Sequence, residues 1–390
     1  MISSRLLVGI AVGSGHEGVD ASLVQVEGEG LSIQTQVRRA MRLPFPLELR
    51  EAIVNKRQPP PYRGVGDCLA GAVRRVANSC GIDCRDLFCA GLLLPNSGAF
   101  STAAEAIADQ AGVTVLTAFS TRDLAAGGVG TPLTPLPDFL SMKSLTEDRL
   151  LIHLGSVTSL VLLPANSRTG NIVAGEAGPG GRFLDALVER GTRGKDHYDT
   201  GGTRAVQGQP IPELLTAWSR HPFLIRKPPK VLSRSEFDDD FVTHAIEQAH
   251  TLGYHLNDLL CTATHFVARC VGATVRQWFP AGDHPRSIFA SGGGTRNGFL
   301  WQLLQQQFPG ETLHRSDDLG VPTLARKAVA AALLCGLTLD GITSNLPQLT
   351  GATGGRLLGR IIPGDPRNWA TVTGWTAERM RDSIQISRAA

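Results

Sequence analysis

The stretch LLVGIAVGSGHEGVDASLVQV, residues 6–26, contains two apolar runs separated by a glycine-rich turn. The first run, Leu6–Val12, is almost continuously apolar, which is typical of a strand covered on both faces. Residues 13–15 supply the conformational freedom that a tight turn needs, and residues 21–26 form the returning strand. We therefore predict a β-hairpin near the start of the chain, followed by a third strand over residues 31–37.

A similar arrangement recurs in the second half of the sequence. Residues 150–154 form an apolar run, Gly155 and Ser156 stand in a turn, residues 159–163 return, and residues 170–174 make a third strand. We interpret this recurrence as a weak internal duplication, in which a three-strand meander with a glycine hairpin opens each half.

Strands alternate with helical patterns in both halves, which predicts an α/β protein of two domains, residues 1–149 and 150–390. Hydrophobic residues make up 42% and charged residues 19% of the 390, a balance typical of a globular protein. The longest apolar run, residues 328–339, is too short to span a bilayer, so we expect no membrane association through a helix.

Charge and cysteine usage give further expectations. The formal net charge is only +3 and is dispersed, which argues against nucleic-acid binding. Seven cysteines without a recognisable secretion signal indicate reduced thiols and a cytoplasmic location.

The glycine-rich turns are the first candidates for chemistry. Backbone N–H groups in such a turn can surround phosphate oxygens, although one turn of this kind is commonplace in hairpins. A third element, the strand 286–290 followed by Gly292–Gly294 and a helix, offers bare backbone on which adenine can lie. Neither the GxGxxG nor the GxxxxGK[ST] pattern occurs in the required context, which excludes dinucleotide and Walker-type sites.

Four stretches resemble the anhydro-N-acetylmuramic acid kinase family, a branch of the actin–hexokinase–Hsp70 ATPase superfamily. They are GSGHEGVD at 13–20, RDLAAGGVGTPL at 122–133, SGGGTRN at 291–297 and NLPQLTGAT at 345–353. A shorter match, GPG at 178–180, is followed by LDA at 184–186.

The resemblance implies two actin-like (ribonuclease H-like) lobes, with mixed sheets flanked by helices and an interlobe cleft. It further implies an ATP- and Mg²⁺-dependent phosphotransferase with an alcohol acceptor, and a homodimer. Family members open 1,6-anhydro-N-acetylmuramic acid with water and phosphorylate its O6, a step in the recycling of cell-wall peptidoglycan. A carboxylate acts as the general base on that water.

Site residues follow from the matched positions. Glu176 stands where the family has its catalytic Asp, and Glu17 is implied as a Mg²⁺ ligand. The residues implied for the nucleotide are Gly13, Ser14, Gly15, Glu17, Gly18, Asp20, Gly155, Ser156, Gly178, Gly292, Gly293, Gly294 and Asn297. Those implied for the sugar are Arg122, Asp123, Gly127, Gly128 and Arg234.

Departures from the family concentrate on the sugar side. Glu176 is one methylene longer than Asp, which extends its reach by roughly an ångström. Residues 89–93, CAGLL, replace the family's C-H-G-Q-T, and Arg326 and Lys327 fall in a segment where the family has an acidic residue. His153 begins the second hairpin turn in place of Asn, and we expect it to pack beside the turn. These losses keep a second hypothesis open, a catalytically weak or inactive paralogue that binds nucleotide or a partner as a sensor or scaffold.

Overall fold

The computed structural model describes residues 4–389 except 14, 56, 57, 59, 96, 166–168, 228, 234 and 283, with side chains described up to residue 379. The chain divides into two compact units. Unit 1 comprises residues 1–142 and 320–390, and unit 2 comprises residues 143–319. The prediction of a single second domain from 150 to 390 is therefore wrong for residues 320–390, because this segment returns to pack on the first sheet.

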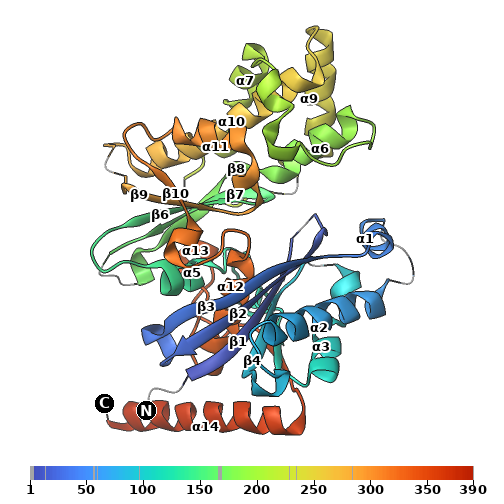
Figure 1. The fold of residues 1–390 in the computed structure, drawn as a ribbon. Coiled ribbons are helices and arrows are strands. Elements are labelled where there is room, and N and C mark those ends of the chain that lie inside the picture. Colours follow the sequence, from blue (N-terminus) through green and yellow to red (C-terminus); the bar gives the residue numbers. More distant parts are fainter. Residues whose placement is uncertain are drawn as a thin grey trace. The chain divides into compact units, whose positions relative to one another are not determined.

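Unit 1 is built on a six-stranded mixed sheet in the order β11-β5-β4-β1-β2-β3 (Figure 1). Strands β1, β2 and β3 form an antiparallel meander, β4 and β5 run parallel to β1, and β11 is antiparallel to β5. The bounds are β1 Ser4–Val12, β2 Gly18–Glu27, β3 Gln34–Pro44, β4 Cys89–Leu93, β5 Val115–Thr117 and β11 Arg360–Ile362. The third strand thus begins later than predicted, after a short helical turn at Gly30–Ser32.

Helices cover both faces of this sheet, as the apolar first strand predicts. Val8 and Ile10 point into the core formed with α2 (Tyr62–Asn78) and α3 (Ala103–Ala111). On the other face, α12 (Arg326–Leu339) lies so close to β1 that a Cβ on Gly9 would sit 1.7 Å from the Ala328 carbonyl oxygen. The remaining helices of unit 1 are α1 Leu47–Val54, α4 Thr121–Ala125, α5 Pro135–Met142, α13 Pro347–Thr350 and α14 Pro366–Ala389.

Unit 2 repeats the same strand plan. Its sheet has the order β10-β9-β6-β7-β8, in which β6, β7 and β8 form the antiparallel meander and β9 and β10 continue in parallel. The bounds are β6 Arg149–Leu154, β7 Val157–Leu163, β8 Val173–Pro179, β9 Ser287–Ser291 and β10 Leu313–Arg315. The shared order of meander and parallel strands confirms the predicted duplication and the predicted α/β class.

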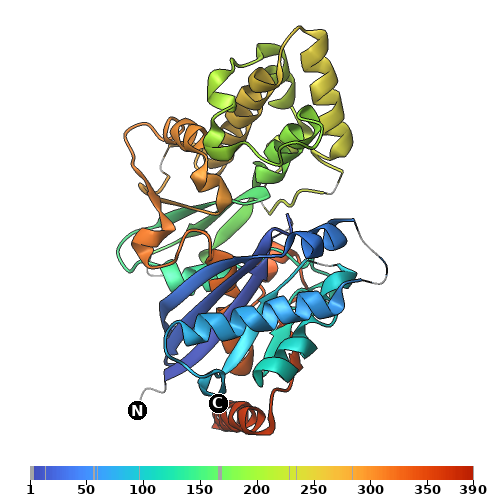
Figure 2. The ribbon, with the colours of Figure 1, turned by 45° about the vertical axis from the view of Figure 1, so that its right-hand side comes forward.

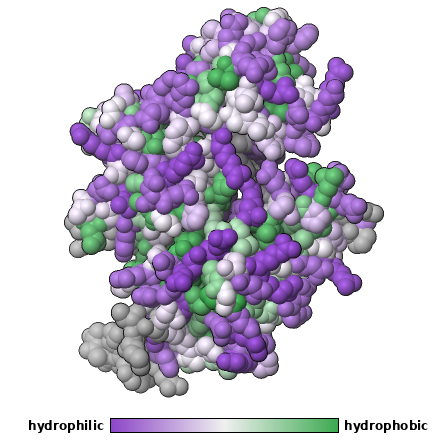
Figure 3. Space-filling model, in the orientation of Figure 1, coloured by the Kyte–Doolittle hydropathy of each residue, from purple (hydrophilic) through white to green (hydrophobic). Residues whose placement is uncertain are grey.

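The core of unit 2 surrounds the long helix α10 (Leu256–Trp278), in which Phe266 is fully buried. Figure 2 shows this helix among the other helices of unit 2. The other helices are α6 Gly181–Gly191, α7 Pro212–Trp218, α8 Pro222–Ile225, α9 Asp239–Thr251 and α11 Gly298–Gln305. The face drawn in Figure 3 mixes hydrophilic and hydrophobic residues without a continuous apolar band. In the part of the chain that the structure describes, no helix has both the length and the apolar character needed to cross a membrane.

Candidate active site

The first glycine turn, residues 13–17, connects β1 to β2 in unit 1. The His16 N–H donates to the Gly13 carbonyl over 3.0 Å, and His16 adopts a φ of +50° that closes the turn. Its ring stacks on Phe100, and burial together with the nearby Arg50 lowers the pKa of His16. Gly15 is exposed and Gly13 half-buried, whereas Ser14 lies outside the described residues.

Two predicted carboxylates lie at the end of this turn and in the strand that follows it. Glu17 lies 3.5 Å and Asp20 3.3 Å from the Arg42 guanidinium, so one arginine joins both acids. Gly18, by contrast, has a packing reason to be glycine, because a Cβ there would sit 2.3 Å from the Leu43 carbonyl oxygen. Among the described residues, no group of three or more His, Cys, Asp or Glu side chains is arranged to hold a metal ion alone.

The second glycine turn, Gly155 and Ser156, connects β6 to β7 in unit 2. The Gly155 carbonyl accepts the Gly181 N–H over 2.8 Å, so the start of α6 rests on this turn. A Cβ on Gly180 would sit 2.5 Å from the same carbonyl oxygen, which explains why glycine occupies this position.

The loop after β9 packs against the same place. Gly292 has a φ of +93°, and a Cβ on it would lie 2.5 Å from the Leu154 carbonyl oxygen, while Gly293 is exposed with open space around it. The Asn297 side chain accepts the Leu300 N–H over 2.9 Å and so caps α11. Three glycine-rich segments, residues 154–156, 180–181 and 292–294, therefore gather at one end of the second sheet. We call these residues the glycine cradle.

His153 lies beside the cradle, as the sequence predicts. Its Nδ1 is 3.0 Å from the Ser291 hydroxyl oxygen, and its Nε2 is 2.8 Å from where a Cβ on Gly155 would stand. The ring thus lies between the second hairpin turn and the triple-glycine loop.

Glu176 is a half-buried residue of β8, opposite Ser159 of β7 at a point where the register shifts. Its backbone N–H donates to the Lys230 carbonyl over 3.0 Å, and its Oε2 accepts the Leu232 N–H. The segment 230–232 therefore holds both the main chain and the carboxylate of Glu176. Sequence reasoning missed this segment, because these two contacts with Glu176 come from backbone groups, which leave no residue signature.

Two further predicted residues of this region have different outcomes. A Cβ on Gly178 would lie 2.9 Å from the Cys270 sulfur, so close packing of β8 on α10 accounts for this glycine without a nucleotide. Arg234 lies outside the described residues.

The predicted sugar loop, residues 122–130, is organised around Asp123. This carboxylate is fully buried and accepts hydrogen bonds from Asn345 Nδ2 (2.8 Å), Thr350 Oγ1 (2.7 Å) and the Gly130 N–H (2.8 Å). Its oxygens face protein groups in this structure, so Asp123 holds the loop, and a direct contact with a sugar stays a prediction.

The glycines of this loop also have structural reasons to be glycine. A Cβ on Gly128 would sit 2.2 Å from the Asp123 carboxylate, and Gly127 has a φ of +81°, so both positions require glycine. Arg122, on α4, is exposed. The sequence did contain a signal for the partners of Asp123. Asn345 and Thr350 belong to the NLPQLTG segment, and Asn and Thr need hydrogen-bond partners when they are buried.

The segments that depart from the family motif are structural here. Ala90 and Leu92 of β4 are buried in the core of unit 1. Arg326, buried at the start of α12, forms an ion pair with the buried Asp138 of α5, in which the Arg326 Nε donates to Asp138 Oδ1 over 2.8 Å.

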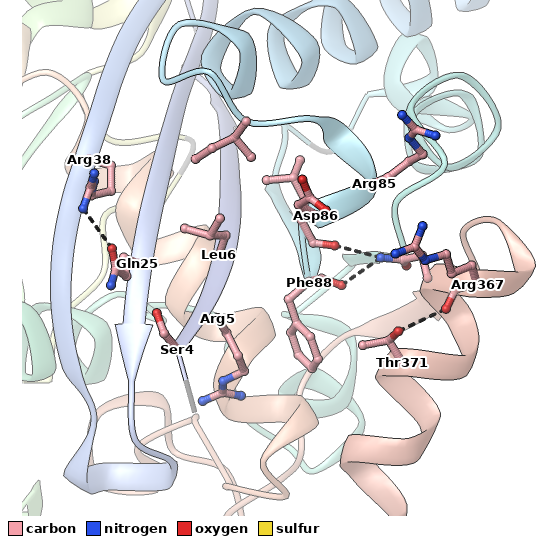
Figure 4. Close-up of a pocket in the computed structure, with 13 residues that line it drawn as sticks. Ser4, Arg5, Leu6, Gln25, Arg38, Arg85, Asp86, Phe88, Arg367 and Thr371 are labelled. Atoms are coloured by element: carbon pink, nitrogen blue, oxygen red, sulfur yellow. Dashed lines mark hydrogen bonds between the residues drawn. The ribbon is translucent and has the colours of Figure 1, made fainter. Parts of the chain in front are cut away.

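A pocket of about 520 Å³ lies at the Ser4 end of β1, the opposite end from the Gly13 turn (Figure 4). Four arginines line it: Arg5, Arg38, Arg85 and Arg367. Their charges are largely balanced, because Arg5 pairs with Asp340 at 2.5 Å, Arg85 pairs with Asp83 at 2.7 Å, and Asp86 also lines the pocket. None of the predicted site residues lines this pocket, so it is not the candidate active site.

Two duplicated α/β units, each opening with a glycine hairpin, define the class: a protein of the actin-like ATPase fold. The chain belongs to the anhydro-N-acetylmuramic acid kinase family, whose model, "Anhydro-N-acetylmuramic acid kinase", matches residues 100–364. Proteins named anhydro-N-acetylmuramic acid kinase from Acaryochloris marina and Picosynechococcus sp. are 30% and 31% identical to this chain. Each alignment covers 91% of this chain, and 99% and 98% of the relatives.

Solved structures give weaker matches. The activator of the 2-hydroxyisocaproyl-CoA dehydratase from Clostridium difficile, with bound ADPNP, has 12% identity and a TM-score of 0.44, covering 84% of this chain and 93% of that chain. A ROK family glucokinase from Streptomyces griseus, in complex with glucose and AMPPNP, has 15% identity and a TM-score of 0.39, covering 84% of this chain and 98% of that chain.

Proposed function

We propose that this protein is an ATP-dependent kinase that opens 1,6-anhydro-N-acetylmuramic acid with water and phosphorylates its O6 during peptidoglycan recycling. The observation that carries the proposal is Glu176, an acid at the family's base position whose carboxylate is held by the Leu232 N–H. Membership of the kinase family supports the same reaction. A carboxylate kept at this position favours catalysis over the non-catalytic alternative.

In the proposed reaction, Glu176 takes a proton from a water molecule as the water oxygen bonds to the anomeric carbon of the sugar. The bond between that carbon and O6 breaks, and O6 bonds to the terminal phosphorus of ATP while the bond to the ADP oxygen breaks. The contact with Leu232 orients one Glu176 oxygen, which matters because proximity catalysis is sensitive to shifts of about 1 Å.

For the nucleotide, we assign the phosphates to the turn at residues 13–15 and to Gly155 and Ser156. Adenosine is assigned to residues 292–294, next to Asn297 at the start of α11. The Gly18 and Gly178 positions keep their packing roles.

Glu17 and Asp20 fit Mg²⁺ by the chemistry of their donors, since this ion prefers carboxylate and phosphate oxygens. Both acids lie beside the Arg42 guanidinium, so the three side chains carry a formal net charge of −1. Bound there with ATP, the ion would neutralise charge that develops on the transferred phosphate. Glu17 and Asp20 would hold it.

For the sugar, we assign the exposed Arg122 and the loop of Gly127 and Gly128, which Asp123 holds in place. Arg234 remains a proposed carboxylate contact. We further propose a homodimer in the cytoplasm, the compartment that the cysteine usage of the sequence favours. Sedimentation of the purified chain would test the dimer.

The decisive experiment is a coupled ADP-release assay with Mg-ATP and 1,6-anhydro-N-acetylmuramic acid. We expect turnover that falls at least about 10²-fold in Glu176→Ala and persists in Glu176→Asp. The exposed Glu213→Ala of α7 serves as the control and should leave turnover unchanged. Absence of ADP release by the wild type, with ATP binding still visible by calorimetry, would support the non-catalytic alternative instead.

A further inference from the structure

His153 occupies a specific position at the edge of the glycine cradle. It is the half-buried residue at the end of β6 that pairs with Ser291 of β9, and its Nδ1 lies 3.0 Å from the Ser291 hydroxyl oxygen. Ser291 is only 3% exposed, so this contact fixes the orientation of the imidazole ring. Both residues stand directly before a glycine-rich segment.

The opposite edge of the ring borders both glycine segments. Nε2 lies 2.8 Å from the position that a Cβ on Gly155 would take, and Cε1 lies 3.1 Å from the corresponding position at Gly292. Because neither glycine has a side chain, this edge of the ring faces bare backbone on two sides. The ring thus borders two of the three segments of the cradle, with Nε2 against Gly155 and Cε1 against Gly292.

We propose that His153 is a phosphate-binding residue of the nucleotide site, whose Nε2–H donates a hydrogen bond to a phosphate oxygen. When the Ser291 hydroxyl donates to Nδ1, the ring proton lies on Nε2, the edge beside Gly155. A hydrogen bond to an ionised phosphate is of the charge-assisted kind, which is stronger than a neutral one. The inference rests on the proposed function, because it takes the cradle as the place of the nucleotide phosphates.

Two matched substitutions separate the two ring nitrogens. In His153→Gln, the amide nitrogen reaches the position of Nε2 and keeps the donor. In His153→Asn, the shorter amide reaches only the position of Nδ1, so the contact with Ser291 is kept and the donor is lost. Affinities of the full-length chain for ADP and for adenosine are measured by calorimetry without sugar, and thermal unfolding checks that each variant is folded.

We expect His153→Asn to weaken ADP binding roughly tenfold and His153→Gln to weaken it less than about threefold. Adenosine binding should be unchanged in both, because adenosine carries no phosphate. Equal ADP affinity in the wild type and His153→Asn would overturn the inference alone. So would a parallel loss of ADP and adenosine affinity, which indicates a merely structural ring. A wild type that binds neither ATP nor ADP contradicts the proposed function, and the inference with it.

Discussion

Asn345 donates a hydrogen bond of 2.8 Å from Nδ2 to Oδ1 of Asp123, which lies 222 residues earlier in the chain. The same carboxylate oxygen accepts the Thr350 hydroxyl over 2.7 Å, and the other oxygen accepts the Gly130 N–H over 2.8 Å. Two of the four family motifs are therefore parts of one structure, in which the segment 345–353 supports the loop 122–133.

Replacing Asp123 should loosen this loop. Asp123→Ala removes the acceptor of two buried side-chain donors, Asn345 and Thr350, and of the half-buried Gly130 N–H, and we expect it to lower the free energy of unfolding by roughly 2–4 kcal/mol. Urea denaturation measures the change, and Asp109→Ala, at an exposed position of α3, provides the control. An Asp123→Ala variant as stable as Asp109→Ala would show that the hydrogen bonds do not hold the loop.

The triple-glycine loop offers a matched pair of substitutions. Gly292→Ala forces a Cβ onto a residue with φ of +93° and within 2.5 Å of the Leu154 carbonyl oxygen, so we expect a loss of roughly 2–4 kcal/mol in unfolding free energy. Gly293 has open space and ordinary backbone angles, so Gly293→Ala should change stability by less than about 0.5 kcal/mol.

Gly293→Ala also tests where adenosine binds. If adenosine lies on this loop, the folded Gly293→Ala variant should bind ATP more weakly, because the new methyl group projects from the exposed side. Calorimetry with ATP measures this effect, and an unchanged affinity would move adenosine away from Gly293.

The sequence was sufficient for the local parts of this fold and insufficient for the long-range ones. Apolar runs with glycine turns predicted both meanders, because a strand and its hairpin partner are close in the chain. The return of residues 320–390 was missed, since β11 is only three residues long and pairs with β5 across more than 200 residues. A pairing of that kind joins segments far apart in the chain and has no periodicity of its own.

The candidate site, like the fold, was only partly predictable from the sequence. Glycine positions in the two turns could be predicted from the motif, whereas the reasons for individual glycines could not. Gly178 packs on Cys270 and Gly128 on Asp123, contacts that only the folded chain reveals. The clamp on Glu176 by backbone groups of residues 230 and 232 is likewise invisible in a side-chain pattern.

The buried ion pair between Arg326 and Asp138 joins α12 to α5. Removing one partner leaves an uncompensated buried charge, so Asp138→Ala should lower the unfolding free energy by about 3–5 kcal/mol. The double variant Asp138→Leu/Arg326→Met removes both charges, and it should be substantially more stable than Asp138→Ala. Chemical denaturation of the two variants and the wild type tests this order. A double variant less stable than Asp138→Ala would contradict it.

Lys230 gives a prediction about pH. Its side chain is 3% exposed, and its Nζ lies 3.4 Å from the Leu224 carbonyl oxygen and 4.9 Å from the centroid of the Phe223 ring. Burial, with a smaller contribution from Arg226, lowers the pKa of Lys230 below its usual 10.5. The unfolded chain therefore binds more protons than the folded chain between the lowered pKa and 10.5, so the stability contributed by this residue rises with pH across that interval.

Lys230→Met keeps the apolar stem and removes the charge. We expect the variant to be more stable than the wild type at pH 7, with a difference that shrinks as the pH rises toward 10.5, where the wild-type lysine loses its proton in both states. Urea denaturation between pH 7 and 10 measures both curves, and the exposed Lys195→Met controls for the loss of a positive charge. Parallel curves for the wild type and Lys230→Met would show that the buried ammonium is not what destabilises the folded chain at neutral pH.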